Sequence, residues 1–335
     1  MGNTTRLHTD VDYERNGKQV GWINMPHSVT RSAYGNISIP IACFKNGTGP
    51  TVFFMSGNHG DEYEGQIALC KLIRTLDPAR IQGRVIVMPA ANLPAVMAGA
   101  RVSPIDQGNL NRAFPGDPDG RPTEQIAYYI DQVLFPMADF HHDLHSGGSS
   151  LDYVPFVSMR KSSDAGLEAR TEAAMRAFGA ENGLVWAYSH DIGLAALAAV
   201  GHGMVALGGE FGGGGTVSTT GVARVERGLS RLLAHAGVVE PIADATPTKP
   251  MCLWEVAGRN YYALATDAGL FEPFVELGAQ VEAGTVCGQI HFVDDPDRPA
   301  KPVAFKTAGM VICKRHPGRV ERGDCVAHLA TEIKD

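Results

Sequence analysis

The sequence predicts an α/β fold with a mainly parallel or mixed sheet flanked by helices, followed by a smaller C-terminal β-sandwich. Before residue 241, short buried apolar runs alternate with longer segments of helical periodicity, which is the pattern of strands and helices in an α/β domain. After residue 250, glycines recur at similar spacings in two β-type segments. The predicted domains are therefore residues 1–245 and 250–335, joined at the Pro-rich stretch "PIADATPTKP".

Size and charge favour a protein that acts on a small molecule. The chain has 335 residues, 44% of them hydrophobic, so it can bury a full core. Its formal net charge is −7, and no basic tract offers a binding surface for nucleic acid or anionic lipid. Because no apolar segment reaches signal-peptide or transmembrane length, we expect a cytoplasmic protein. The sequence leaves open whether the chain forms a homo-oligomer.

The N-terminal part contains strands and helices in alternation. Because the strands of such a fold run mainly parallel, ligands are expected in the crevice at their carboxyl ends. The expected strands cover residues 51–57, 83–92, 138–148 and 203–215, and the expected helices cover residues 65–76, 123–137 and 167–183, the last closed by Gly183.

The C-terminal part contains a weak internal repeat. Three glycines recur about forty residues further on at similar spacings, which favours a small β-sandwich with two-fold symmetry. Two unrelated hairpins are the alternative interpretation. The glycines are Gly269, Gly278 and Gly284 in the first unit and Gly309, Gly318 and Gly323 in the second.

The stretch "NHGDEYEG", residues 58–65, follows the first of these strands and raises the question of a metal site. Its His59 and Glu62 carry an imidazole and a carboxylate, both of which are zinc ligands. A loop at a strand end lets them reach the crevice. For this stretch alone, however, a polar turn is the simpler interpretation.

A third candidate ligand follows another strand, in "DFHHDLHSGG". Strand alternation places His141, Asp143 and His145 on one face and His142 on the other, where core packing is expected. Hydrolytic zinc sites commonly have three protein ligands and one open position for water. His145 and the earlier pair supply three ligands for one Zn²⁺ per chain. Asp143 either orients the His145 imidazole or makes a plain structural hydrogen bond.

A candidate general base lies in "GGEFGGGG". Glu210 follows a buried apolar run, where a carboxylate costs free energy unless it has a role or a partner. Beside a metal-bound water it would accept a proton and return it to the leaving amine. A glutamate in a flexible glycine loop is the alternative.

Candidate substrate-binding residues lie in and before "GNLNRAFPG". Arg112 offers a planar fork that fits a carboxylate, and Asn111 can steady the same group. Arg101 lies ten residues upstream of Asn111. A solvent-exposed arginine is the alternative for either Arg.

The motifs "GNHGDEYEG", "GNLNRAFPG", "DLHSGG" and "GGEFGG" resemble, in this order, those of the succinylglutamate desuccinylase and aspartoacylase family, relatives of zinc carboxypeptidases. The resemblance covers residues 20–330 and implies a carboxypeptidase-like α/β domain, a separate C-terminal β domain and hydrolysis of an N-acyl amino acid. It also implies that His59, Glu62 and His145 are the zinc ligands and that Glu210 is the catalytic carboxylate. Asn111 and Arg112 would form the clamp for the substrate carboxylate, and Arg101 would be the arginine that polarises the scissile carbonyl.

The same resemblance bears on the substrate. Three stretches, "GKQVGWINMPHSV", "GNHGDEYEGQIAL" and "SPIDQGNLNRAFPGDPDG", look most like the family members that deacetylate N-α-acetyl-L-2,4-diaminobutyrate in ectoine breakdown. That substrate carries an ammonium side chain, which acidic residues in the motif loops would favour. Arg101, Arg112 and Arg121 in the same region would instead favour an anionic side chain. These acidic residues are Asp61, Glu64, Asp106 and Asp117.

Other functions remain open at this point. N-succinylglutamate and N-acetylaspartate are the alternative substrates. Aspartoacylase also uses a tyrosine of its C-terminal domain, for which Tyr261 and Tyr262 are the candidates here. Two further classes are a non-catalytic ligand-binding protein on a hydrolase scaffold and a peptidase that releases C-terminal residues.

Overall fold

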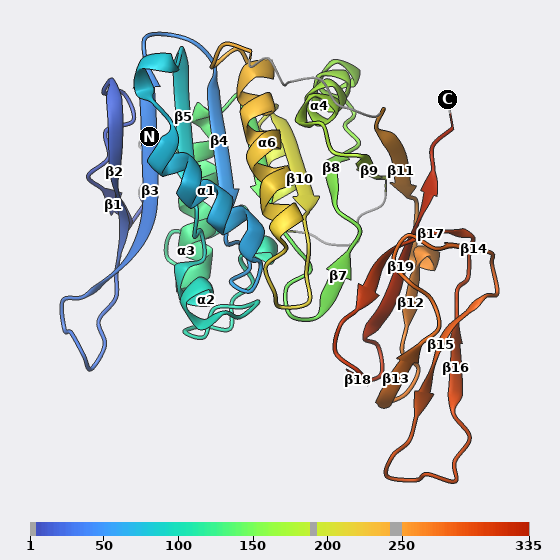
Figure 1. Cartoon of the computed structure of the whole chain (residues 1–335). Helices are drawn as coiled ribbons and strands as arrows, with labels where there is room; N and C mark the ends of the chain where they lie inside the picture. The colour runs from blue at the N-terminus through green and yellow to red at the C-terminus, as the bar shows by residue number, and fades with distance from the viewer. Residues whose placement is uncertain (1–4, 188–192, 242–249, 335) are drawn as a thin grey trace.

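The computed structural model describes residues 5–187, 193–241 and 250–334. A long mixed sheet runs through the molecule, helices cover both of its faces in the N-terminal part, and a second sheet lies in the C-terminal part (Figure 1). The predicted fold class is therefore confirmed. Most of the predicted linker lies outside the described residues, and the division at residues 245–250 stays a prediction.

Four parallel strands form the centre of the long sheet, in the order β5–β4–β6–β10. Their sequences are nearly continuous apolar runs because helices cover both faces. All four lie within the predicted strands, which extended further at one or both ends, and their carboxyl ends meet at the edge where the motif loops leave. Their bounds are β4 (Thr51–Ser56), β5 (Gly83–Met88), β6 (Phe140–Leu144) and β10 (Val205–Glu210).

Antiparallel pairings on both sides make the sheet mixed. At one end, a hairpin of β2 (Gly17–Pro26) and β3 (Asn36–Asn46) pairs with β5, and the short β1 (His8–Thr9) pairs with β2. On the other side β8 pairs antiparallel with β10, and β9 and β11 then continue parallel to β8. These three strands are β8 (Phe156–Arg160), β9 (Asn182–Trp186) and β11 (Cys252–Val256).

Two groups of helices cover the central strands, one on each face (Figure 1). One face carries α1 (Tyr63–Thr75), α4 (Ala165–Phe178) and α6 (Thr219–His235). The other carries α2 (Leu93–Ala98), α5 (Ala195–Gly201) and α3 (Pro122–Tyr129), which continues as a π turn (Ile130–Leu134) and a 3₁₀ turn (Phe135–Met137). The described residues also form three further short 3₁₀ turns, η1 (Pro78–Arg80), η2 (Leu110–Arg112) and η5 (Arg259–Tyr261).

The predicted end of α4 was wrong. The helix stops at Phe178, and Gly179 takes the left-handed conformation, with φ 78°, that commonly ends a helix. Gly183, the predicted stop, lies instead inside β9. Two glycines near the same boundary made the sequence ambiguous.

The C-terminal strands form the predicted two-fold sandwich. The units β13–β14–β15 and β17–β18–β19 exchange their short middle strands, because β14 pairs with β17 and β18 pairs with β13. Gly269 and Gly309 open the two units with φ values of 159° and 155°, and at either one a Cβ would lie within 2.5 Å of a backbone carbonyl oxygen. The strands are β12 (Tyr262–Leu264), β13 (Gly269–Pro273), β14 (Gln280–Val281), β15 (Val286–His291), β16 (Lys301–Ala304), β17 (Gly309–Arg315), β18 (Arg319–Val320) and β19 (Cys325–Glu332).

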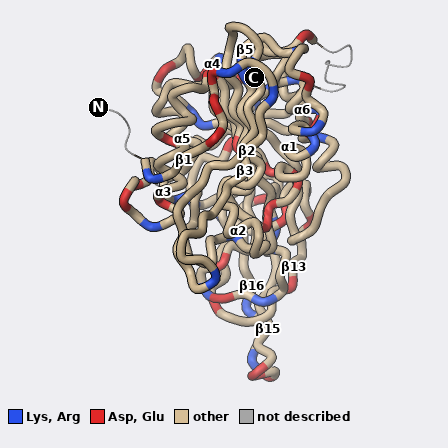
Figure 2. The backbone as a smooth tube through the Cα atoms, turned by 90° about the vertical axis from the view of Figure 1, so that its left-hand side faces the viewer, with Lys and Arg blue, Asp and Glu red and all other residues tan. Residues whose placement is uncertain are grey.

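The two parts of the molecule share strands at their junction. β19 pairs with β11 of the long sheet, and β7 (Leu151–Tyr153) pairs with β17. Seen from the β2–β3 end, acidic and basic residues are interspersed (Figure 2). Within the described segments, no helix has the length and apolarity needed to cross a membrane.

Besides His59, three of the described histidines are buried in the protein interior. His141 and His142 point to opposite faces of β6, as predicted. His141 stacks on Phe53, and His142 makes an edge-to-face contact with Phe178. His328 lies in β19 and is equally buried. Burial lowers the pKa of His141 to about 4 and that of His142 and His328 to about 3, so all three are neutral at neutral pH.

These histidines predict that the protein loses stability as the pH falls. In the unfolded chain these histidines bind protons below about pH 6.5, whereas in the folded protein they stay neutral to a much lower pH. Stability is therefore lost as the pH falls through 6.5. At pH 5 the loss is about 2 kcal/mol per group. Urea unfolding of the wild type and of His328→Phe at pH 7.5 and 5 measures the contribution of His328 to this loss. An equal pH dependence of the free energy of unfolding in both proteins would contradict a neutral, buried His328.

Candidate active site

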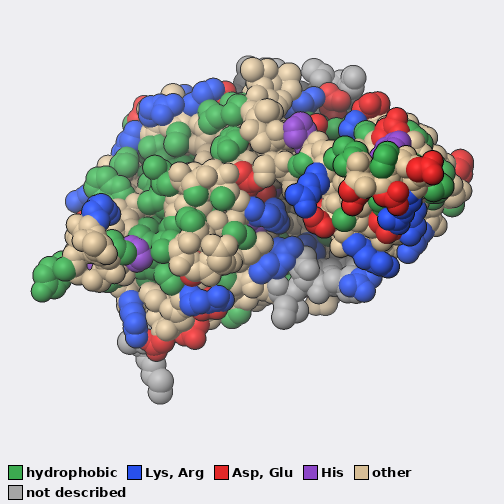
Figure 3. Space-filling model, turned by 90° about the horizontal axis from the view of Figure 1, so that it is seen from below, with side chains coloured by type: hydrophobic (Ala, Val, Ile, Leu, Met, Phe, Trp, Pro, Cys, Tyr) green, Lys and Arg blue, Asp and Glu red, His purple; other side chains and the backbone are tan. Residues whose placement is uncertain are grey.

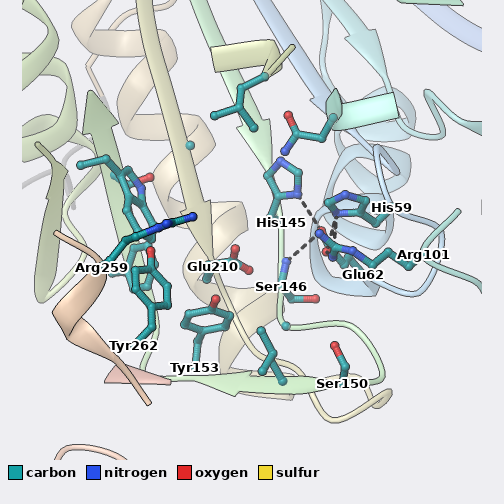
Figure 4. A pocket seen from close by; sticks show the side chains of 18 of the residues that line it. His59, Glu62, Arg101, His145, Ser146, Ser150, Tyr153, Glu210, Arg259 and Tyr262 are labelled. Atoms are coloured by element: carbon teal, nitrogen blue, oxygen red, sulfur yellow. Dashed lines mark hydrogen bonds and ion pairs between the residues drawn. The ribbon is translucent and has the colours of Figure 1, made fainter. Parts of the chain in front are cut away.

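Three side chains from two strand ends converge at the carboxyl edge of the central strands. His59 Nδ1 lies 2.7 Å from Glu62 Oε1, and His145 Nδ1 lies 2.7 Å from Glu62 Oε2. The three are buried or nearly so, and one potential ligand atom of each lies within 4.8 Å of the others. They are the residues that the sequence singled out as zinc ligands, and Figure 4 shows them grouped on one side of the cavity.

The hydrogen-bonding capacity of His59 fits a cation at this point. Its Nδ1 faces the Glu62 carboxylate, and its Nε2 faces Asn109 Oδ1 at 3.2 Å, so acceptor oxygens lie at both ring nitrogens. Burial lowers the pKa of His59, which keeps the ring neutral. A neutral imidazole carries a single N–H and cannot donate to both acceptors. With the proton on Nε2, the Nδ1 lone pair and the carboxylate form a donor set suited to Zn²⁺.

His145 is oriented by a second carboxylate. Its Nε2 lies 2.8 Å from Asp143 Oδ2, which also accepts a hydrogen bond from Asn58 Nδ2 at 2.9 Å. Asp143 therefore makes both predicted kinds of contact, one with the His145 imidazole and one structural hydrogen bond with Asn58. Such outer partners fix the tautomer and orientation of a metal-binding histidine.

Neighbouring charges shift the pKa values of His145 and Glu62 in opposite directions. Burial opposes the charged form of His145, but Asp143 and Glu62 outweigh it and raise the pKa of His145 well above its ordinary value. Burial would raise the pKa of Glu62, but His59 and His145 bring it well below its ordinary value. A metal ion would therefore compete with a proton for His145, so metal affinity should fall as the pH falls.

Two buried acidic residues of the same stretch fix the surrounding loops. Asp61 accepts hydrogen bonds from both the backbone N and the hydroxyl of Ser149, each at 2.8 Å, which ties the "NHGDEYEG" loop to the loop after His145. Glu64 accepts from the backbone N of Ser218 at 2.8 Å and so holds the glycine-rich exit of β10. Gly60 is required here because a Cβ would lie 2.0 Å from the Ala95 carbonyl oxygen.

Glu210 lies beside His145 on the neighbouring strand. The two residues form a parallel β-bridge across the carboxyl ends of β6 and β10. Oε2 of Glu210 is buried without a hydrogen-bond partner among the described residues. Burial, followed by the Glu62 carboxylate, raises the pKa of Glu210 to about 8. A carboxylate so placed can exchange a proton with a group bound at the His59–Glu62–His145 site.

A cavity of about 1080 Å³ opens from this group towards the C-terminal part. Several Lys and Arg side chains gather where the two parts of the molecule meet (Figure 3). The acidic residues in the described lining of the cavity all belong to the metal-binding and proton-transfer group, namely Glu62, Asp143 and Glu210. The basic residues in the lining are Arg101, Arg112, Arg160, Arg259, Lys306 and Arg322.

The four acidic residues expected to favour a cationic substrate do not line the described part of this cavity, so that prediction was wrong. Asp61 and Glu64 hold loops together. Asp106 accepts hydrogen bonds from the backbone and hydroxyl of Thr123, and Asp117 accepts one from the backbone of Asp119. Each of the four carboxylates accepts a hydrogen bond from a backbone N–H, which sequence spacing does not reveal.

The residues expected to bind substrate do line the cavity. Asn111 Oδ1 accepts a hydrogen bond from Ala195 N at 3.0 Å, so its amide presents N–H donors on the other side. Arg112 donates to the Asn111 carbonyl at 2.8 Å. Arg101 lies 3.5 Å from Glu62 Oε1, with its side chain 45% exposed. Arg121 lies outside the described lining and pairs with Glu124.

Several lining residues were missed by sequence reasoning. Of the two candidate tyrosines, Tyr262 lines the cavity, whereas the hydroxyl of Tyr261 lies 2.9 Å from that of Thr331. Tyr153 and Arg259 also line it, and Figure 4 shows Glu210 between the metal-binding group and the Arg259–Tyr262 pair. No local motif marks these positions. Asn109, however, stands inside the quoted "GNLNRAFPG" motif and could have been found there.

Comparison with known proteins now identifies the family. Residues 48–236 match the model of the succinylglutamate desuccinylase/aspartoacylase catalytic domain. The chain belongs to this family. The resemblance inferred from the four motifs is thus confirmed.

Relatives match over nearly the whole chain. An N-α-acetyl-L-2,4-diaminobutyric acid deacetylase of Halomonas elongata is 39% identical over 330 residues, which cover 98% of this chain and 96% of that protein. The product-bound structure of the ectoine utilization protein EutE (DoeB) from Ruegeria pomeroyi has a TM-score of 0.94 at 37% identity, covering 98% and 99% of the two chains. A succinylglutamate desuccinylase/aspartoacylase structure from Rhodobacter sphaeroides has a TM-score of 0.92 at 39% identity, covering 98% and 100%.

The site geometry predicts one Zn²⁺ per chain, bound by His59, Glu62 and His145. The double variant His59→Ala/His145→Ala should lose it, and the exposed His235→Ala should keep it. Asp143→Asn keeps the three ligands but weakens the orientation of His145, so affinity should fall about 10- to 100-fold. Metal analysis and chelator competition measure these effects. Stoichiometric zinc in the double variant would refute the ligand assignment.

Proposed function

We propose that the protein is a zinc-dependent, cytoplasmic deacylase that hydrolyses the amide bond of a small N-acyl amino acid. The first candidate substrate is N-α-acetyl-L-2,4-diaminobutyrate. The observation that supports hydrolysis best is the convergence of His59, Glu62 and His145 with Glu210 alongside on the next strand. Membership of the desuccinylase/aspartoacylase family supports the same reaction class.

The proposed reaction divides the work among a few side chains. A bound Zn²⁺ would lower the pKa of its own water to about 7 and favour the ionised form of Glu210. Glu210 accepts the proton of the attacking water and passes it to the leaving amine, so the acid and the free amino acid form without a covalent enzyme intermediate. Arg101, beside Glu62, stabilises negative charge on the scissile carbonyl oxygen.

Substrate orientation falls to the residues of η2. Arg112 and the amide N–H groups of Asn111 form a clamp for the α-carboxylate, since both line the cavity close to the start of α5. An acyl amino acid held by this carboxylate directs its amide bond towards His145 and Glu210.

The choice of acetyl-diaminobutyrate rests on the relatives. The named deacetylase from Halomonas elongata and the ectoine utilization protein from Ruegeria pomeroyi each match 98% of this chain. Identity at this level over the full length supports a shared substrate class.

One observation favours a second candidate. The described part of the cavity lining has six basic residues, and its acidic residues all belong to the group around the metal site. Such a lining suits a second carboxylate on the substrate, as in N-acetylaspartate or N-succinylglutamate.

Replacing Glu210 tests the proton-transfer role. Glu210→Gln keeps the shape of the side chain but cannot accept the proton, so kcat should fall by about 10²-fold or more. Zinc content should not change, because Glu210 is not among the three ligands. Steady-state kinetics and metal analysis on the same preparation measure both. Near-wild-type turnover would make Glu210 a structural residue.

A substrate panel tests the proposed function. The panel contains N-acetyl-2,4-diaminobutyrate, N-acetylornithine, N-acetylaspartate, N-succinylglutamate and short peptides. We expect N-acetyl-2,4-diaminobutyrate to have the highest kcat/KM. A tenfold preference for either dicarboxylate or tricarboxylate, about 1.4 kcal/mol of transition-state binding, would select the second candidate. Preference for peptides would indicate a carboxypeptidase. Binding of acyl amino acids without turnover by the zinc-loaded protein would indicate a ligand-binding function.

A further inference from the structure

Four planar side chains from four strands stack in a column at the wall of the cavity. His328 of β19 lies directly opposite Tyr262 of β12 in the strand register, with ring centroids 4.1 Å apart and planes 18° apart. On its other side is Trp186 of β9, at 5.8 Å and 5°. The guanidinium of Arg160, at the end of β8, lies 6.0 Å from the Trp186 ring.

The column crosses the junction between the two parts of the molecule. Arg160 and Trp186 belong to the N-terminal part, and His328 and Tyr262 to the C-terminal part. Arg160, Trp186 and Tyr262 line the cavity, whereas His328 lies behind them and is only 1% exposed. His328 therefore bridges Trp186 and Tyr262, whereas Phe156, which also lines the cavity, contacts Trp186 directly with ring centroids 6.3 Å apart.

A histidine at this position is costly. Among the described residues, neither ring nitrogen of His328 has a hydrogen-bond partner, and an unpaired buried polar group costs free energy. Burial also keeps the ring neutral, since it lowers its pKa to about 3. What the neutral ring does provide is two flat faces, one for Tyr262 and one for Trp186.

The stacked wall lies away from the metal-binding group. Figure 4 shows Tyr262 on the far side of Glu210 from His59, Glu62 and His145. With the acyl group at the metal-binding site and the α-carboxylate held by Asn111 and Arg112, as proposed above, the part of the substrate left to reach this wall is its side chain.

We propose that His328 is a positioning residue for substrate selectivity: it holds Trp186 and Tyr262, and through Trp186 the Arg160 guanidinium, where the wall meets the side chain of the substrate. The proposal rests on the deacylase function proposed above. His328 itself does not touch the substrate and takes no part in the chemistry.

Kinetics with two substrates tests this role. His328→Ala removes both stacking contacts and should raise KM about tenfold for the best substrate of the panel, with kcat changed less than about twofold. KM for N-acetylglycine, which has no side chain to reach the wall, should stay unchanged. His328→Phe retains a flat ring and should restore the wild-type KM.

A matched variant separates positioning from stability. Phe292 is buried in the core of the C-terminal sandwich, away from the column. Phe292→Ala should lower Tm as His328→Ala does, but leave the ratio of the two KM values unchanged. The proposal is overturned if His328→Ala affects both substrates equally, or if Phe292→Ala shifts the ratio to the same extent.

A binding measurement keeps the proposal testable if no acyl amino acid is hydrolysed. In a Trp22→Phe/Trp254→Phe background, Trp186 is the remaining tryptophan, and its emission should respond to free 2,4-diaminobutyrate or aspartate. His328→Ala should weaken that binding about tenfold. If no acyl amino acid is hydrolysed but Trp186 emission responds in this way, only the deacylase function is rejected. If the Trp22→Phe/Trp254→Phe protein shows no emission change with either ligand, the role of His328 is rejected.

Discussion

The contact of one carboxylate with two imidazoles organises the site. Glu62 stands at the N-terminus of α1, its two oxygens lie 2.7 Å from His59 and His145, and all three are largely shielded from water. A neutral His59 with its proton on Nε2 faces Asn109 and keeps a lone pair on Nδ1, beside the Glu62 carboxylate and 3.4 Å from Arg101 Nη1, which suits a cation. The position of β4 against β6, the start of α1 and the bridge from His145 to Glu210 all serve to hold this arrangement.

Buried carboxylates hold the loops that carry these residues. Asp61 binds the loop after His145 through Ser149, and Glu64 binds the exit of β10 through Ser218. The sequence suggested that these acids face a cationic substrate, because they stand beside the metal motif. Their hydrogen bonds join residues far apart in the chain, and local spacing cannot distinguish a loop anchor from a substrate contact. Within the described residues, the cavity they were expected to line is instead rich in Arg and Lys.

The central strands and the C-terminal repeat were predictable, whereas the strand pairings at the junction of the two parts were not. The four parallel strands are apolar runs because both faces are covered, and the metal and proton-transfer candidates follow directly from the ends of such runs. The C-terminal repeat was visible because Gly269 and Gly309 occupy conformations that disfavour a side chain. In contrast, Trp186, Tyr262 and Arg259 reach the cavity only because β9, β12 and η5 meet at the junction, and pairing between distant strands leaves no local signal.

The central claim is that His59, Glu62 and His145 form a single divalent-cation site, with both histidines coordinating through Nδ1. Anomalous diffraction at the zinc edge from crystals of zinc-loaded protein tests it most directly. The account predicts one full-occupancy peak, about 2.0–2.2 Å from both Nδ1 atoms and from a Glu62 oxygen, with the Nε2 atoms still facing Asn109 and Asp143. A peak elsewhere, or coordination through Nε2 with the rings turned over, would contradict it.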